Sequence, residues 1–112
     1  MAWKKTGVAF ATLAPGSMRE VNLDGAPVLL VRLAEDVHAI AAICTHEGGI
    51  LVDGSLEEGR LTCPVHGARF DPRSGSVIAD PDGIEPPEGA IEPLARYEVR
   101  VAGGMVEVDL GD

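Results

Sequence analysis

The chain has 112 residues, of which 46% are hydrophobic and only 4% are aromatic, and its 18 acidic against 9 basic residues give a net charge of -9. This length predicts one domain with a modest core. The negative charge argues against binding to nucleic-acid phosphates, which requires basic residues, and the few aromatic side chains leave little for stacking on bases. The charge fits ordinary solubility, and it equally fits steering toward a basic face on a partner.

The N-terminal residues 1–11 predict a first strand, followed by a turn at Pro15-Gly16. Their apolar part is short for a signal peptide, and no convincing cleavage site follows it. No apolar run in the chain approaches the roughly 18–20 residues that span a bilayer. We therefore expect no membrane association and a cytoplasmic location, where cysteines stay reduced.

The rest of the chain breaks into short runs of Val, Ile and Leu separated by turn residues, which predicts an all-β fold. Residues 28–40 predict a hairpin that turns at Glu35-Asp36. Residues 97–110 alternate apolar and polar side chains around Gly103-Gly104 and predict a second hairpin. Residues 80–89 are rich in proline, which lacks the amide donor of a strand ladder, and predict a surface loop. No repeat or second domain is evident, so we expect a single domain over residues 1–112.

The most informative segment is Cys44-Thr45-His46, followed after residues 47–62 by Cys63-Pro64-Val65-His66-Gly67. Two short loops thus each supply one thiolate and one imidazole. Thiolate and imidazole are ligands of both zinc and iron–sulfur centres. The predicted site residues are Cys44, His46, Cys63 and His66.

The spacing within each loop favours iron–sulfur over zinc. Structural zinc sites usually take ligand pairs two to four residues apart, and Cys63 and His66 obey that spacing. Cys44 and His46 are separated by one residue and would have to reach a single ion from a very tight chain. In a two-iron centre, each loop can direct its cysteine to one iron and its histidine to the other. A structural zinc module that mediates protein contacts stays open, and it would be colourless and unfold with chelators.

This four-ligand pattern, Cys-x-His followed by Cys-Pro-x-His-Gly, resembles the signature of the Rieske family. Residues 68–77 resemble the strand and turn that leave the cluster in Rieske ferredoxins. The resemblance implies an antiparallel β-sandwich base with a small cluster-binding subdomain, inserted at about 43–69. It also implies one [2Fe–2S] cluster per chain, bound on one iron by Cys44 and Cys63 and on the other by His46 and His66.

The resemblance further implies an electron carrier without an active site of its own. We expect a Rieske ferredoxin that takes electrons from a flavin-containing, NAD(P)H-dependent reductase and passes them to a terminal oxygenase of an aromatic-ring dioxygenase system. The length supports this expectation, because it leaves no room for the mononuclear-iron domain of an oxygenase. A small Rieske-like subunit of an assimilatory nitrite reductase is the alternative with the same cluster.

Four other residues bear on the surroundings of the expected cluster. We expect Phe70 in the core beneath it, His38 as an ordinary strand residue and Glu47 as a solvated loop carboxylate. Pro81 would belong to a third loop over the cluster, although the sequence does not place it. High-potential Rieske proteins carry an additional cysteine in each loop, and these form a disulfide between the loops. Neither loop of this chain has one, so we expect a reduction potential that is low for the family.

Overall fold

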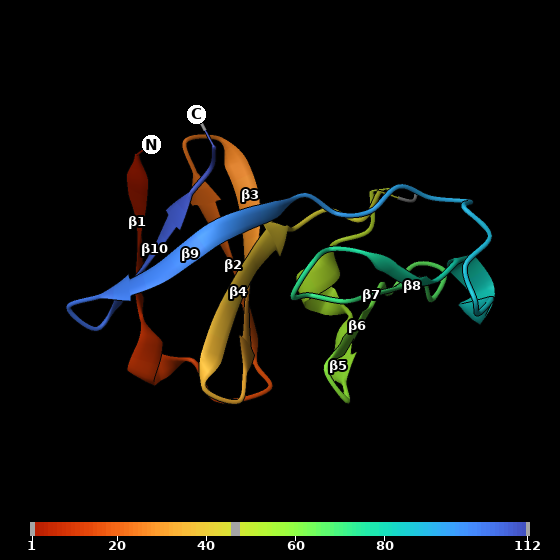
Figure 1. Cartoon of the computed structure of the whole chain (residues 1–112), viewed down its shortest axis with the longest axis horizontal. Coiled ribbons are helices and arrows are strands. Elements are labelled where there is room, and N and C mark those ends of the chain that lie inside the picture. Colours follow the sequence, from red (N-terminus) through yellow and green to blue (C-terminus); the bar gives the residue numbers. More distant parts are fainter. Residues whose placement is uncertain (1, 46–47, 112) are drawn as a thin grey trace.

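The chain forms two antiparallel β-sheets that lie side by side along its longest dimension (Figure 1). The computed structural model describes residues 2–45 and 48–111. The strands are β1 (Trp3–Ala9), β2 (Met18–Leu23), β3 (Ala26–Leu33), β4 (Asp36–Ala41), β5 (Ser55–Glu57), β6 (Arg60–Thr62), β7 (Arg69–Phe70), β8 (Val77–Ala79), β9 (Arg96–Ala102) and β10 (Met105–Asp109). Three short 3₁₀ helices complete the fold: η1 (Phe10–Thr12), η2 (Leu51–Asp53) and η3 (Pro81–Gly83). Within the described ranges, no helix has the length and hydrophobicity needed to cross a membrane.

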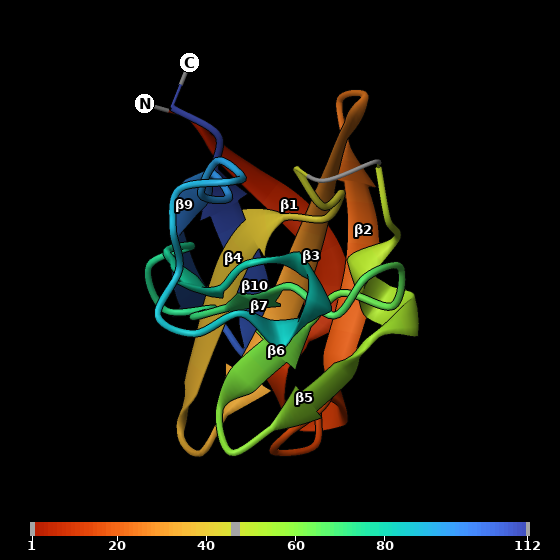
Figure 2. The same ribbon diagram turned by 90° about the vertical axis from the view of Figure 1, so that its right-hand side faces the viewer.

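The larger sheet forms the base of the molecule, with strand order β1-β10-β9-β4-β3-β2. Its edge strands β1 and β2 contact each other, so the base is nearly a closed barrel. The smaller sheet, with order β5-β6-β7-β8, lies beyond β4 and is seen face-on in Figure 2. This arrangement confirms the predicted all-β, antiparallel fold with a small second unit.

Strand β3 explains how the two sheets share their interior. Its residues 28–31 are all fully buried, because successive side chains point to opposite faces and both faces are covered. Val28 and Leu30 pack inside the base, whereas Leu29 and Val31 pack against the smaller sheet. The core between the sheets contains Leu29, Val31, Ile40, Ala42, Cys44, Leu51, Leu61, Cys63, Ala68, Phe70 and Leu94. The expected core position of Phe70 is therefore confirmed, and both cysteines lie in the same core.

Both predicted hairpins are present, with one difference in a turn. Gly103 and Gly104 join β9 to β10 with φ of 58° and 80°, as a type I′ turn requires. The turn between β3 and β4 lies one residue earlier than predicted. Asp36 pairs with Leu33 and so belongs to β4, which leaves Ala34 and Glu35 as the turn residues.

His38 should make the stability of the fold depend on pH. It lies on β4 opposite Val31 and is half-buried, and burial lowers its pKa below 6.5 although the nearby Asp36 carboxylate opposes the change. Because the unfolded chain then binds the proton more readily, this contribution to stability is lost as pH falls below about 6.5. We expect the unfolding free energy, measured by urea titration, to fall less in His38→Gln than in wild type when the pH is lowered from about 7.5 to about 5.5. Equal losses in the two proteins would contradict this.

Candidate metal centre

The first predicted ligand loop follows directly from β4. The chain leaves the strand through Ala42 and reaches Cys44, whose amide donates to the carbonyl of Gly49 over 2.8 Å. Ile43 and Ile50 form an isolated antiparallel bridge on either side of this bond. Cys44 and Gly49 therefore lie side by side at the base of the first loop.

The second loop repeats this arrangement between β6 and β7. The amide of Cys63 donates to the carbonyl of Ala68 over 2.8 Å, and the amide of Gly67 donates back to the carbonyl of Cys63 over 3.2 Å. Gly67 has φ of +75°, a left-handed conformation that favours glycine. In both loops the cysteine amide thus bonds to the carbonyl five residues later. The two cysteines occupy equivalent positions at the bases of two similar loops.

The two loops meet at Gly49. A Cβ atom built on Gly49 would lie 2.6 Å from Sγ of Cys63, 2.8 Å from Cγ2 of Val65 and 3.5 Å from Cβ of Cys44. Only a residue without a side chain fits there. The structure therefore brings Cys44 and Cys63 together beside this glycine, although they are far apart in the sequence.

Burial differs sharply between the predicted ligands. Cys44 and Cys63 are only 3% and 2% exposed, whereas His66 lies at the surface, beside Val65, which is 43% exposed. His46 and the neighbouring Glu47 lie outside the described residues. Among the residues that are described, no group of three or more His, Cys, Asp or Glu side chains could hold a metal ion, and the predicted set of four includes His46.

The chemistry of the described donors fits a sulfur-ligated metal group. Two thiols lie together in an apolar core, and His66, three residues after Cys63, lies at the surface. Soft thiolate ligands select iron–sulfur clusters, zinc or copper(I) over magnesium or calcium, which prefer oxygen ligands. The buried sulfur atoms are shielded from water, while His66 is accessible to another molecule.

Two supporting contacts were not anticipated from the sequence. Thr45 Oγ1 donates to the carbonyl of Glu92 over 2.6 Å, which ties the first loop to the segment before β9. The amide of Asp82 in η3 donates to the carbonyl of His66, which ties the second loop to residues 80–88, here called the third loop. The predicted proline-rich loop containing Pro81 thus contacts the second loop. Both contacts join segments distant in sequence, and no local pattern indicates them.

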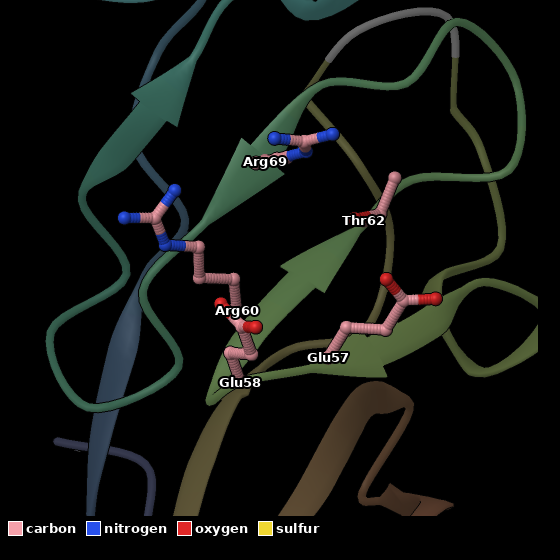
Figure 3. A pocket seen from close by; sticks show the side chains of 5 residues that line it. All are labelled: Glu57, Glu58, Arg60, Thr62 and Arg69. Carbon is pink, nitrogen blue, oxygen red and sulfur yellow. The ribbon is translucent and has the colours of Figure 1, made fainter.

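A shallow pocket of about 150 Å³ lies on the face of the smaller sheet, beside the base of the second loop (Figure 3). It is lined by Glu57, Glu58, Arg60, Thr62 and Arg69. The carboxylates and guanidinium groups around it give it mixed charge. It contains none of the predicted ligands.

The family model described as Rieske [2Fe-2S] domain matches residues 5–97. Among curated relatives, apoptosis-inducing factor 3 of Homo sapiens is 36% identical over 96 residues, and the chain spans only 14% of the length of that protein. Ferredoxin CarAc of Metapseudomonas resinovorans is 32% identical over 107 residues, which cover 95% of this chain and 92% of the ferredoxin.

Solved structures agree with these matches. A ferredoxin in a complex of reduced oxygenase and oxidized ferredoxin in carbazole 1,9a-dioxygenase superposes with a TM-score of 0.81 at 31% identity, covering 95% of this chain and 91% of that chain. A structure described as a putative NADH-dependent nitrite reductase small subunit from Mycobacterium tuberculosis gives a TM-score of 0.77 at 25% identity, covering 96% and 93%. With a family model that matches most of its length, the chain belongs to the family of Rieske [2Fe–2S] domains.

Proposed function

We propose that this chain is a ferredoxin that carries single electrons to a terminal oxygenase. The observation that carries the proposal is the match with ferredoxin CarAc, which extends over nearly the full length of both chains. A second support is the similarity to a ferredoxin that was solved together with its oxygenase. The role is that of an electron-transfer component rather than of a catalyst.

We also propose the ligands: Cys44 and Cys63 on one iron, and His46 and His66 on the other, within one domain over residues 1–112. The adjacent buried cysteines support the first pair. When bound, a [2Fe–2S] cluster accepts and releases one electron at a time. Cysteine burial keeps water from the sulfur side of the site, whereas the exposed His66 leaves one side open to a partner.

Three exposed apolar side chains lie in or next to the loops around the proposed site. Ile50, which follows the first loop, is 41% exposed, and Val65 in the second loop is 43% exposed. Ile84 in the third loop is 47% exposed. We propose that these side chains contribute to the surface that a partner contacts, because the buried core of a protein interface is enriched in apolar side chains. A flavin-containing, NAD(P)H-dependent reductase as electron donor and a cytoplasmic location belong to the same proposal.

The experiment that tests the cofactor and its ligands uses the anaerobically purified chain. We expect a red-brown protein that contains about two irons and two sulfides per chain and bleaches with dithionite. The reduced protein should give the low-average-g EPR signal of a histidine-ligated cluster. A colourless, EPR-silent protein with stoichiometric zinc would contradict the proposal and favour the structural zinc module.

A redox titration tests the expected potential. Two imidazoles in place of two thiolates leave the oxidised centre neutral, so reduction is easier than for an all-cysteine cluster. Neither ligand loop has a second cysteine, and the second loop, residues 63–68, offers no hydroxyl group for a hydrogen bond to sulfur. We expect a midpoint near about −150 mV, the lower end of the Rieske range. A clearly positive midpoint would contradict this expectation.

A second candidate function is supported by one observation, the similarity to a nitrite reductase small subunit. In that case the chain would associate stably with a large sirohaem subunit. Co-purification of the tagged chain from its source cells separates the two functions. A stable complex containing sirohaem would favour the second, and a free carrier that reduces an added oxygenase would favour the first.

A further inference from the structure

The third loop is organised around one buried carboxyl group. Asp80 is 2% exposed, although residues 82–90 that follow it are exposed. Its amide donates to the carbonyl of Ile84 over 2.9 Å, and its carbonyl accepts from the amide of Gly83 over 3.1 Å. Its side-chain Oδ2 accepts from the amide of Glu88. Asp80 therefore joins the start of the third loop to its middle through its backbone and to its end through its side chain.

This buried carboxyl group is not a typical surface-loop acid. Among the side chains of residues 2–45 and 48–111, Oδ1 of Asp80 is a buried polar atom without a hydrogen-bond partner. Burying a carboxyl group with one oxygen unsatisfied opposes folding, and an apolar side chain would avoid that cost. The hydrogen bond that Oδ2 accepts from the Glu88 amide offsets part of this cost.

The loop that Asp80 closes reaches the proposed metal centre. The amide of Asp82 donates to the carbonyl of His66 in the second loop. Asp82 has φ of 68°, a left-handed conformation that is unfavourable for a residue with a Cβ. It is held in this conformation between the hydrogen bonds that Asp80 makes to Gly83 and Ile84.

We propose that Asp80 is a positioning residue of the metal centre. By closing the third loop, it holds the Asp82 amide against the backbone of His66 and so restricts the orientation of the His66 imidazole. The inference rests on the proposed role of His66 as a ligand. Groups that orient a ligand tune the metal it binds, so loss of this contact changes the properties of the centre and not only the stability of the loop.

The test compares two substitutions that remove the same hydrogen bond from opposite sides. Asp80→Ala removes the acceptor, and Glu88→Pro removes the amide donor while leaving Asp80 in place. We expect both to raise hydrogen exchange in peptides covering the third loop by about tenfold. We also expect both to shift the g-values and the midpoint potential of the holoprotein. Asp80→Asn, which retains an acceptor for the Glu88 amide, should restore most of the protection.

Two matched controls separate position from charge. Glu88→Ala removes the same exposed side chain as the proline substitution but keeps the amide. Asp82→Asn removes one negative charge from the same loop and keeps the donor to His66, and asparagine tolerates the left-handed conformation. Both controls should match wild type in exchange and g-values.

Three outcomes would overturn the inference. The first is a holoprotein of Asp80→Ala or Glu88→Pro with wild-type g-values and midpoint. The second is a potential shift in Asp82→Asn as large as in Asp80→Ala, since that would assign the effect to charge. The third is unchanged exchange in the third loop. A wild-type protein without the Rieske EPR signal would instead defeat the proposed function, and the exchange result would still report on the loop.

Discussion

Cys63→Ser is expected to abolish cluster binding, with an iron content at least about tenfold below wild type and no visible colour. Cys63 is 2% exposed and lies against Gly49 in the core, so no other thiol can replace it without rearranging both loops. A serine hydroxyl is a harder ligand and is not ionised at neutral pH. Iron and sulfide analysis, the visible spectrum and EPR of the reduced protein measure the loss.

The matched control for this substitution is Thr62→Ser, one residue earlier at the end of β6. Thr62 is half-buried and lines the shallow pocket rather than the metal centre, so this variant should keep the full iron content. A coloured Cys63→Ser protein with wild-type iron would remove Cys63 from the proposed ligands. Loss of zinc in place of iron would support the structural zinc module.

Gly49→Ala is expected to have the second large effect. Its φ lies outside the left-handed region, so the backbone accepts alanine and the effect comes from the added atom alone. That atom would lie 2.6 Å from Sγ of Cys63 and 2.8 Å from Cγ2 of Val65, closer than a Cβ atom approaches either sulfur or carbon in proteins. Forcing the loops apart should cost about 1–3 kcal/mol of stability and separate the two cysteines. Iron content and the melting temperature measure the outcome.

Gly48→Asn controls for a side chain in the first loop. Gly48 has φ of +67°, which asparagine tolerates, and among the described residues outside its chain neighbours a Cβ there would meet only Cγ2 of Ile43, at 4.0 Å. This variant should keep its iron and lose less than about 1–2 kcal/mol. Wild-type iron content and melting in Gly49→Ala would show that the second loop can move aside, and would remove the steric argument.

Some features of the fold could be predicted from the sequence, and others could not. The hairpins could be predicted because alternation and Gly-Gly turns act over a few residues. The exact position of the turn between β3 and β4 could not be predicted. It follows from the pairing of Leu33 with Asp36, and that register depends on which side chains the two faces of the strands bury. Likewise, the run at residues 28–31 indicated a buried strand, but not that its alternate side chains belong to two different cores.

The sequence by itself determined the kind of chemistry, because the types and spacing of Cys44, His46, Cys63 and His66 restrict the metal groups that two short loops can bind. Only the tertiary structure decided that both cysteines lie buried next to Gly49, and that Asp80 closes a loop onto the backbone of His66. In the sequence, Asp80 is indistinguishable from the other acidic residues of its loop. Its burial follows from long-range packing, and a carboxyl group becomes an anchor only where the fold excludes water and presents an amide to it.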